Sequence, residues 1–192
     1  MIRFKQAASV LAAAVLATAL PLAQAQSSAT DSRIGWYGDL AVGGSHYESE
    51  PGFITCRCRK GSATAMKIGA GYRFGVSAVE AWYLDFGKAN FGADNYGPAT
   101  SAHFRAAVLG GAWAVRWGPY VEATWRVGAA FANTATDRGS QHDVRPTLGF
   151  SIGWRTTETA TLELGVDYLR ASDAGGARTD AVPITLGFRQ RF

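Results

Sequence analysis

The stretch AVPITLGFRQRF, residues 181–192, decides the fold class. Its apolar side chains fall on one face of an extended strand, and small or polar side chains fall on the other. The apolar face comprises Val182, Ile184, Leu186, Phe188 and Phe192. Such a strand suits lipid on one side and a polar lumen on the other, as in the last strand of a bacterial outer-membrane barrel. We interpret Phe188 and Phe192 as a C-terminal assembly signal.

The opposite end of the chain predicts export from the cytoplasm. Arg3 and Lys5 precede an apolar run that is followed by the sequence AQA at 23–25. A basic start, a short apolar stretch and a small-x-small sequence are typical of a secretory signal peptide. A membrane-anchoring helix is the alternative, but it would require roughly 20 consecutive apolar residues. We therefore predict a signal peptide at 1–25 and one barrel domain at 26–192.

The composition favours a β protein and gives no support for a nucleic-acid partner. The chain has 23 glycines among 192 residues and 12% aromatic residues, and strongly alternating segments recur along it. Its formal charge is +4, of which Arg3 and Lys5 supply half. No stripe of Lys and Arg with interleaved aromatic residues occurs, so we expect no nucleic-acid partner.

Eight segments alternate with a period of two, and each has about the 9–11 residues that a tilted strand needs to cross a bilayer, or slightly more. Their polar face mixes Gly with Arg, Lys and Glu, which suits a narrow, wet interior better than a soluble sandwich. We predict an all-β fold, an eight-stranded antiparallel up-and-down transmembrane β-barrel. The predicted strands are 34–44, 64–75, 79–88, 102–115, 119–132, 143–155, 160–169 and 181–192.

Short and long connections alternate between these strands. The short connections lie around 76–78, 116–118 and 156–159. The long connections lie around 45–63, 89–101, 133–142 and 170–180. Outer-membrane barrels have short periplasmic turns and longer extracellular loops. We therefore predict a bacterial outer-membrane location, with both termini in the periplasm and the four long loops outside the cell.

The predicted strand at 102–115 contains a conflict. If Arg105 faces the lumen, strict alternation also turns Trp113 and Trp117 inward. A β-bulge at Gly110-Gly111 would turn both tryptophans out to lipid, and we favour this interpretation.

The inward positions carry charges of both signs in similar number. The interior of an eight-stranded barrel is just wide enough for side chains, and an unpaired buried charge is costly, so these charges should pair. Two interpretations stay open, a structural network that fills the lumen and a narrow pore gated by an exchange of Glu–Arg partners. The predicted network comprises Asp39, Lys67, Arg73, Glu80, Arg105, Glu122, Arg126, Arg145, Glu163, Asp167 and Arg189.

The two cysteines, Cys56 and Cys58, are separated by one residue. Export places them in an oxidising compartment, where a local disulfide, an intermolecular disulfide or two free thiols are the alternatives; a local bond at this spacing is sterically awkward. A metal site would need further ligands, and His46 is the only candidate nearby. We predict no metal and no cofactor.

The histidines give the best case for catalysis. His46, His103 and His142 fall near the predicted outer end, with Ser and Asp residues close in sequence. A hydrolase acting on lipid A or on peptides would need such a residue beside a nucleophile or an acid. The chain lacks a lipid A deacylase signature of the His-x-Ser-Asn type and a P-loop or Rossmann fingerprint. We predict no enzymatic activity.

Four stretches together resemble a known family. They are Gly35-Trp36-Tyr37, AMKIGAGYRFG at 65–75, TLELGVDYL at 161–169 and ITLGFRQRF at 184–192. With the strand count and the loop alternation, they resemble the OmpA-like barrel family of Gram-negative bacteria, which includes opacity-type surface proteins. The resemblance implies an interior salt-bridge network with Glu80 and Glu163 as members. Many members carry a peptidoglycan-binding domain after the barrel, and we expect no such role here.

These features favour a structural or surface-interaction role, similar to that of an adhesin, through four extracellular loops. A narrow ion-conducting pore is the alternative, and a lipid A-modifying enzyme is a more distant one. The expected partners are outer-membrane lipid and lipopolysaccharide, the barrel assembly machinery, and a host or surface ligand at the loops.

Overall fold

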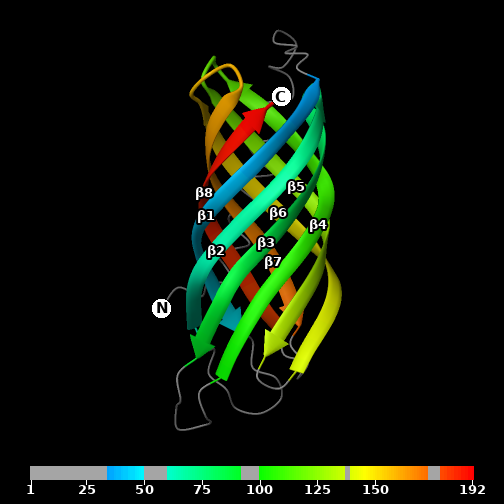
Figure 1. Ribbon diagram of the computed structural model, residues 1–192, viewed down its shortest axis with the longest axis vertical. Coiled ribbons are helices and arrows are strands. Elements are labelled where there is room, and N and C mark those ends of the chain that lie inside the picture. Colours follow the sequence, from blue (N-terminus) through cyan, green and yellow to red (C-terminus); the bar gives the residue numbers. More distant parts are fainter. Residues whose placement is uncertain (1–33, 50–59, 92–99, 137–138, 173–177) are drawn as a thin grey trace. The chain divides into compact units, whose positions relative to one another are not determined.

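The computed structural model describes residues 34–49, 60–91, 100–136, 139–172 and 178–192. The strands are β1 (Gly35–Ser49), β2 (Lys60–Phe74), β3 (Ser77–Phe91), β4 (Thr100–Trp117), β5 (Val121–Thr136), β6 (Gly139–Arg155), β7 (Ala160–Ser172) and β8 (Arg178–Arg191). Each strand pairs antiparallel with its neighbours in sequence, and β8 pairs with β1 to close the sheet (Figure 1). The predicted eight-stranded antiparallel barrel is confirmed.

Two predictions fall outside the part of the chain that the structure describes. They concern the signal peptide at 1–25 and the redox state of Cys56 and Cys58, and both stay predictions. No helix among the described residues is long and apolar enough to span a membrane.

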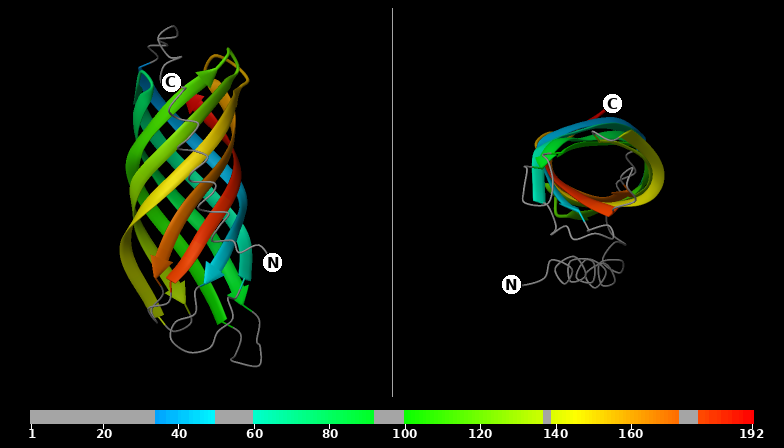
Figure 2. Two further views of the ribbon diagram at one scale, coloured as in Figure 1. Left: turned by 180° about the vertical axis from the view of Figure 1, so that it is seen from behind. Right: turned by 90° about the horizontal axis from the view of Figure 1, so that it is seen from below.

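The barrel has two ends, which we call the turn end and the loop end. At the turn end the strands are joined by residues 75–76, 118–120 and 156–159. At the loop end they are joined by residues 50–59, 92–99, 137–138 and 173–177. The strands run at an incline around the barrel between these ends, and the C-terminus lies at the turn end (Figure 2).

The strands reach further toward the loop end than the sequence predicted. Strand β5 continues to Thr136 and pairs there with Gly139 of β6, although the sequence assigns 133–142 to a loop. Backbone hydrogen bonds hold the ladder together whether lipid or water lies outside it. The apolar alternation stops where the outward residues become polar, so the sequence signal ends before the strand does.

Outward-facing side chains form an apolar band around the barrel. On β5 it runs from Val121 to Phe131, and on β6 from Trp154 to Val144. About ten residues at roughly 3.3 Å each, on a strand tilted by about 40°, rise roughly 25 Å, which matches the apolar band of an outer-membrane barrel. Glu122 and Arg126 of β5, which the sequence placed inside the barrel, are buried as predicted.

Strand β4 faces the opposite way from the prediction. Phe104, Ala106 and Val108 are buried inside the barrel, whereas the side chain of Arg105 is outside and 50% exposed. The prediction that Arg105 faces the lumen is wrong. It assumed a polar interior along the whole barrel, but the interior is apolar and the exterior polar where Arg105 lies.

The predicted β-bulge at Gly110-Gly111 is also wrong. Both residues pair with β3 without a break, and Trp113 and Trp117 face outward, 47% and 46% exposed. The register instead shifts between Asp85 and Lys88 on β3. Gly87 has a φ of 77° there, a left-handed conformation that side chains other than glycine rarely adopt.

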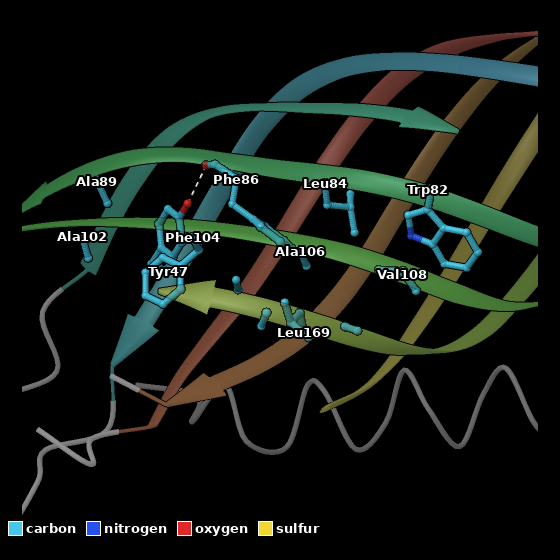
Figure 3. Close-up of a cluster of buried hydrophobic side chains, with 13 residues drawn as sticks. Tyr47, Trp82, Leu84, Phe86, Ala89, Ala102, Phe104, Ala106, Val108 and Leu169 are labelled. Carbon is cyan, nitrogen blue, oxygen red and sulfur yellow. Dashed lines mark hydrogen bonds between the residues drawn. The ribbon is translucent and has the colours of Figure 1, made fainter. Parts of the chain in front are cut away.

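The lumen is filled by two different kinds of side chain. Toward the turn end it holds buried ion pairs, and toward the loop end it holds a hydrophobic cluster that we call the apolar plug (Figure 3). The plug comprises Tyr47, Trp82, Leu84, Phe86, Ala89, Ala102, Phe104, Ala106, Val108, Ala130, Ala132, Leu169 and Ala181. Inside it, the rings of Tyr47 and Phe104 stack with their centroids 5.1 Å apart.

Candidate functional site

The centre of the charged half is Arg126 on β5. Its Nε lies 3.0 Å from Oε2 of Glu80 on β3, and its Nη2 lies 3.1 Å from Oε2 of Glu163 on β7. Its Nη1 donates to Oγ of Ser151 at 2.9 Å. The Arg126 side chain is only 3% exposed. Three strands thus place their polar groups around one guanidinium, which satisfies most of its donors.

A second arginine, Arg189 on β8, joins the same carboxylates to the rest of the network. Its Nη1 lies 2.9 Å from Oε1 of Glu163, and its Nη2 lies 3.7 Å from Glu80 and 3.9 Å from Asp39. The guanidinium also sits 4.7 Å from the centroid of the Tyr37 ring, whose hydroxyl donates to Glu80. Arg189 therefore bridges several carboxylates that would otherwise repel one another.

The pair nearest the apolar plug is Lys67 on β2 and Asp167 on β7. The Lys67 Nζ lies 3.0 Å from Oδ2 of Asp167, with both side chains at least nine-tenths buried. The same ammonium sits 5.1 Å from the centroid of the Trp82 ring, which belongs to the plug. The boundary between the charged and apolar halves is thus an ion pair against an aromatic face.

At the turn end the network finishes at Glu122 on β5. Arg73 on β2 binds this carboxylate with both terminal nitrogens, at 2.9 and 2.8 Å. Arg191 approaches it at 3.4 Å and Arg116 at 3.6 Å. The bidentate geometry is the strongest form of an arginine–carboxylate contact.

The structure brings together most of the residues that the sequence nominated for the lumen. They are Asp39, Lys67, Arg73, Glu80, Glu122, Arg126, Glu163, Asp167 and Arg189. Arg105 is excluded because it lies outside the barrel. Arg145 lies apart from this group, where it contacts Asp143 at 3.2 Å with 39% of its side chain exposed.

Sequence reasoning missed four polar members of the site. They are Tyr37, Arg116, Ser151 and Arg191. Three of them share the inward face with residues that were nominated, since Tyr37 is two positions from Asp39 and Arg191 two from Arg189. Arg116 was missed because the sequence assigned 116–118 to a short connection, whereas β4 continues to Trp117 and turns Arg116 inward.

A small cavity of about 20 Å³ adjoins Asp39, Lys67 and Arg126. This volume is room for about one water molecule. Side chains, rather than a column of water, therefore fill the lumen at this level.

All three histidines lie in the described part of the chain. Nε2 of His103 lies 2.7 Å from Oδ1 of Asp85 on the outside of the barrel, and His46 and His142 are exposed. Ser45 is buried and donates to the carbonyl oxygens of Ala63 and Phe86. No cluster of three or more His, Cys, Asp or Glu suited to a metal ion occurs in the described part of the chain.

Residues 10–192 match the family model of the outer membrane protein beta-barrel domain. The chain belongs to this family. The resemblance drawn from its sequence motifs is therefore confirmed at the level of an outer-membrane barrel, and the family is one of the bacterial outer membrane. A comparison with curated proteins gives no match.

Two solved structures illustrate the shared fold. Neisserial surface protein A is 15% identical, with a TM-score of 0.60 over 82% of this chain and 97% of that chain. The outer membrane protein OprG from Pseudomonas aeruginosa is 14% identical, with a TM-score of 0.53 over 81% of this chain and 96% of that chain. At these identities the likeness concerns the fold alone.

Proposed function

We propose that the protein is a closed outer-membrane barrel with a structural or surface-interaction, adhesin-like role, and that it carries out no catalysis. The observation that carries this proposal is the filled lumen. Buried ion pairs occupy its turn-end half and the apolar plug occupies its loop-end half. A barrel without an open water path does not act as a channel. Its function would instead depend on its rigid frame and on the surfaces at its two ends.

The plug supports the closed state independently of the charges. Tyr47, Leu84 and Phe86 are at most 1% exposed, and Phe104 is 2% exposed. An exchange of partners within the charged half would leave this apolar layer in place. A passage so narrow and filled mostly by apolar side chains leaves no continuous path of hydrogen-bond partners for water.

We further propose that the turn end faces the periplasm and that the loop end faces outward, as in outer-membrane barrels generally. The long connecting segments would then meet a host or surface ligand. The apolar band would contact outer-membrane lipid, and the polar residues beyond it, such as Arg105 and Lys88, would lie at the level of lipopolysaccharide headgroups. The barrel assembly machinery would recognise Phe188 and Phe192.

The first experiment is planar-bilayer conductance of the folded protein beside a Glu80→Ala variant. A silent bilayer, with folding verified by the mobility shift between unheated and boiled samples on a gel, is the expected result. Steady single-channel steps that change in the variant would overturn the closed-barrel proposal in favour of a narrow pore gated by interior salt bridges.

The surface role has its own test. Replacing residues 50–59 by a Gly/Ser linker of equal length should abolish binding of expressing cells to host matrix while the barrel still folds. Replacing the turn at residues 118–120 is the matched control at the opposite end. Equal binding by both variants and the parent would contradict an adhesin-like role for this segment.

A further inference from the structure

Four arginines form a ring inside the turn-end opening of the barrel. Arg73, Arg116, Arg155 and Arg191 lie at or one residue before the turn-end limits of β2, β4, β6 and β8. Each occupies an inward position of its strand. Because alternate strands supply them, they are distributed around the opening rather than stacked on one wall. We call them the mouth arginines.

The ring carries four positive charges, and the carboxylates nearest to it are those of Glu122 and Glu158. Glu122 is the only inward-facing acidic residue at this level among the described residues, and Arg73, Arg116 and Arg191 all approach it. Arg191 is in addition repelled by Arg73, Arg116 and Arg155. Glu158 in the turn at 156–159 is a second carboxylate at this end. Glu158, Arg116 and Arg155 each take part in interactions of their own, and Glu163 acts on Arg73 from deeper in the lumen.

Donors in the ring also lack acceptors. Among the described residues, Nε of Arg73 and Nη1 of Arg191 are buried atoms with no hydrogen-bond partner. The Arg73 side chain itself is 7% exposed. Buried polar atoms nearly always have a partner, and an exception calls for an unseen water or ion. Here the surrounding charge favours an anion over water.

The opening gives access to the ring. The side chain of Arg116 is 21% exposed and that of Arg191 is 11% exposed. A ligand arriving from the turn end would meet these side chains before it met Glu122, which is 2% exposed.

We propose that the mouth arginines bind a multivalent oxyanion, namely a free phosphate or the phosphoryl group of a small molecule. Guanidinium groups present planar pairs of donors that match phosphate oxygens, so several arginines can share one such group. The anion offsets the excess positive charge and supplies the missing acceptors. The central group of Arg126, Glu80 and Glu163 takes no part. The site goes beyond the proposed function, because binding at the mouth requires neither a closed plug nor a surface ligand.

The test is calorimetric titration of the folded full barrel in phosphate-free detergent with inorganic phosphate, at an ionic strength held constant with sodium chloride. We expect saturable binding. The double variant R116Q/R155Q should weaken it at least tenfold, because it removes two of the ring's charges and leaves the Arg73–Glu122 contact intact. Arg170→Gln is the matched control, since Arg170 binds Asp180 at the loop end, and its affinity should stay within twofold of the parent.

A variant that is expected to strengthen phosphate binding separates an effect on binding from a folding defect. Glu122→Gln removes the carboxylate that competes for the arginines, so phosphate should bind at least threefold more tightly. If this variant does not fold, the double variant decides alone. Absence of saturable binding to the parent, or equal affinity in R116Q/R155Q, would overturn the proposal.

Glycerol 3-phosphate is the second probe. Affinity similar to that of inorganic phosphate would identify a phosphorylated small molecule as the natural class of ligand, and much weaker affinity would identify the free ion. Both outcomes support the site, whereas only the titration of the parent and its variants can reject it.

Discussion

At the turn end the barrel is filled by guanidinium and carboxylate groups from strands all around it, whereas at the loop end it is filled by aromatic rings and methyl groups. Both fillings occupy the same narrow lumen, yet they depend on different physics. An ion pair requires its partner at a set distance and in a set orientation, while a hydrophobic cluster requires mainly the right volume.

The difference implies unequal tolerance to substitution. Removing one charged group from the turn-end half leaves its partners buried and unpaired, which is costly however small the change in volume. Removing part of a ring from the plug leaves a void whose cost depends on how far neighbouring side chains can close it. We expect even a small substitution in the charged half to lower the stability strongly. In the apolar half the loss of stability should increase with the volume that the substitution removes.

The largest effect should come from Arg126→Met, which keeps the bulk and removes the charge. Glu80 and Glu163 would each lose their closest or second-closest cation. We expect the free energy of unfolding in lipid vesicles, followed in urea by gel mobility, to fall by about 3–5 kcal/mol. The same change at Arg145, which is 39% exposed, should cost about 1 kcal/mol or less. Equal losses would show that burial does not distinguish the two arginines.

A somewhat smaller effect is expected for Phe104→Ala in the apolar plug. The void beside Tyr47 should lower the free energy of unfolding by about 3 kcal/mol. Phe104→Leu should cost less than about 1.5 kcal/mol, because it preserves most of the volume. Phe131→Ala is the control on the outer face, where 56% of the residue is exposed and lipid can fill the space. If Phe104→Leu lowered the free energy of unfolding as much as Phe104→Ala does, the plug would tolerate substitution no better than the charged half.

The contact between Tyr37 and Glu80 can be broken without touching a charge. A Cβ at Gly71 would lie 2.5 Å from Cζ of Tyr37 and 2.9 Å from the carbonyl oxygen of Val79. Gly71→Ala should therefore displace the Tyr37 ring and cost about 1–3 kcal/mol in unfolding experiments. At Gly111 the nearest atom would be 3.7 Å away, so Gly111→Ala should change stability little. If the two variants had the same free energy of unfolding, the close packing at Tyr37 would not contribute to stability.

The smallest effect should follow from Tyr37→Phe. It removes one hydroxyl that donates to Glu80, while Arg126 continues to bind that carboxylate. The expected loss is about 1 kcal/mol, the net worth of one hydrogen bond. Tyr120→Phe, at a tyrosine that is 61% exposed, serves as the control and should be neutral. A loss above 3 kcal/mol would mean that the hydroxyl orients the whole network.

Much of the fold was predictable because lipid outside and side chains inside impose a period of two on every strand. Alternation located all eight strands, and on β8 it assigned Ile184 and Arg189 to the correct faces. The same rule failed on β4, where the sequence contains a charged residue, Arg105, beyond the apolar band. A charge marks the inside of such a strand only within the height of the lipid.

The inward residues of the candidate site were also largely predictable, since burial of charge follows from the same alternation. Their partners were not. Arg126 binds Glu80 and Glu163 from strands β3 and β7, and no spacing along the chain encodes that choice. Pairing depends on strand tilt and stagger, which set the height of each residue in the lumen.

The sequence by itself determined a closed barrel of eight strands, its alternating faces and the set of charges that must be buried, because each of these is written as a local period or a residue type. Only the tertiary structure decided that the loop-end half of the lumen is apolar, that Arg105 lies outside, and that four arginines from alternate strands meet at one opening. Those features arise when strands distant in sequence reach a common height in the barrel, and that height is a property of the closed sheet rather than of any one strand.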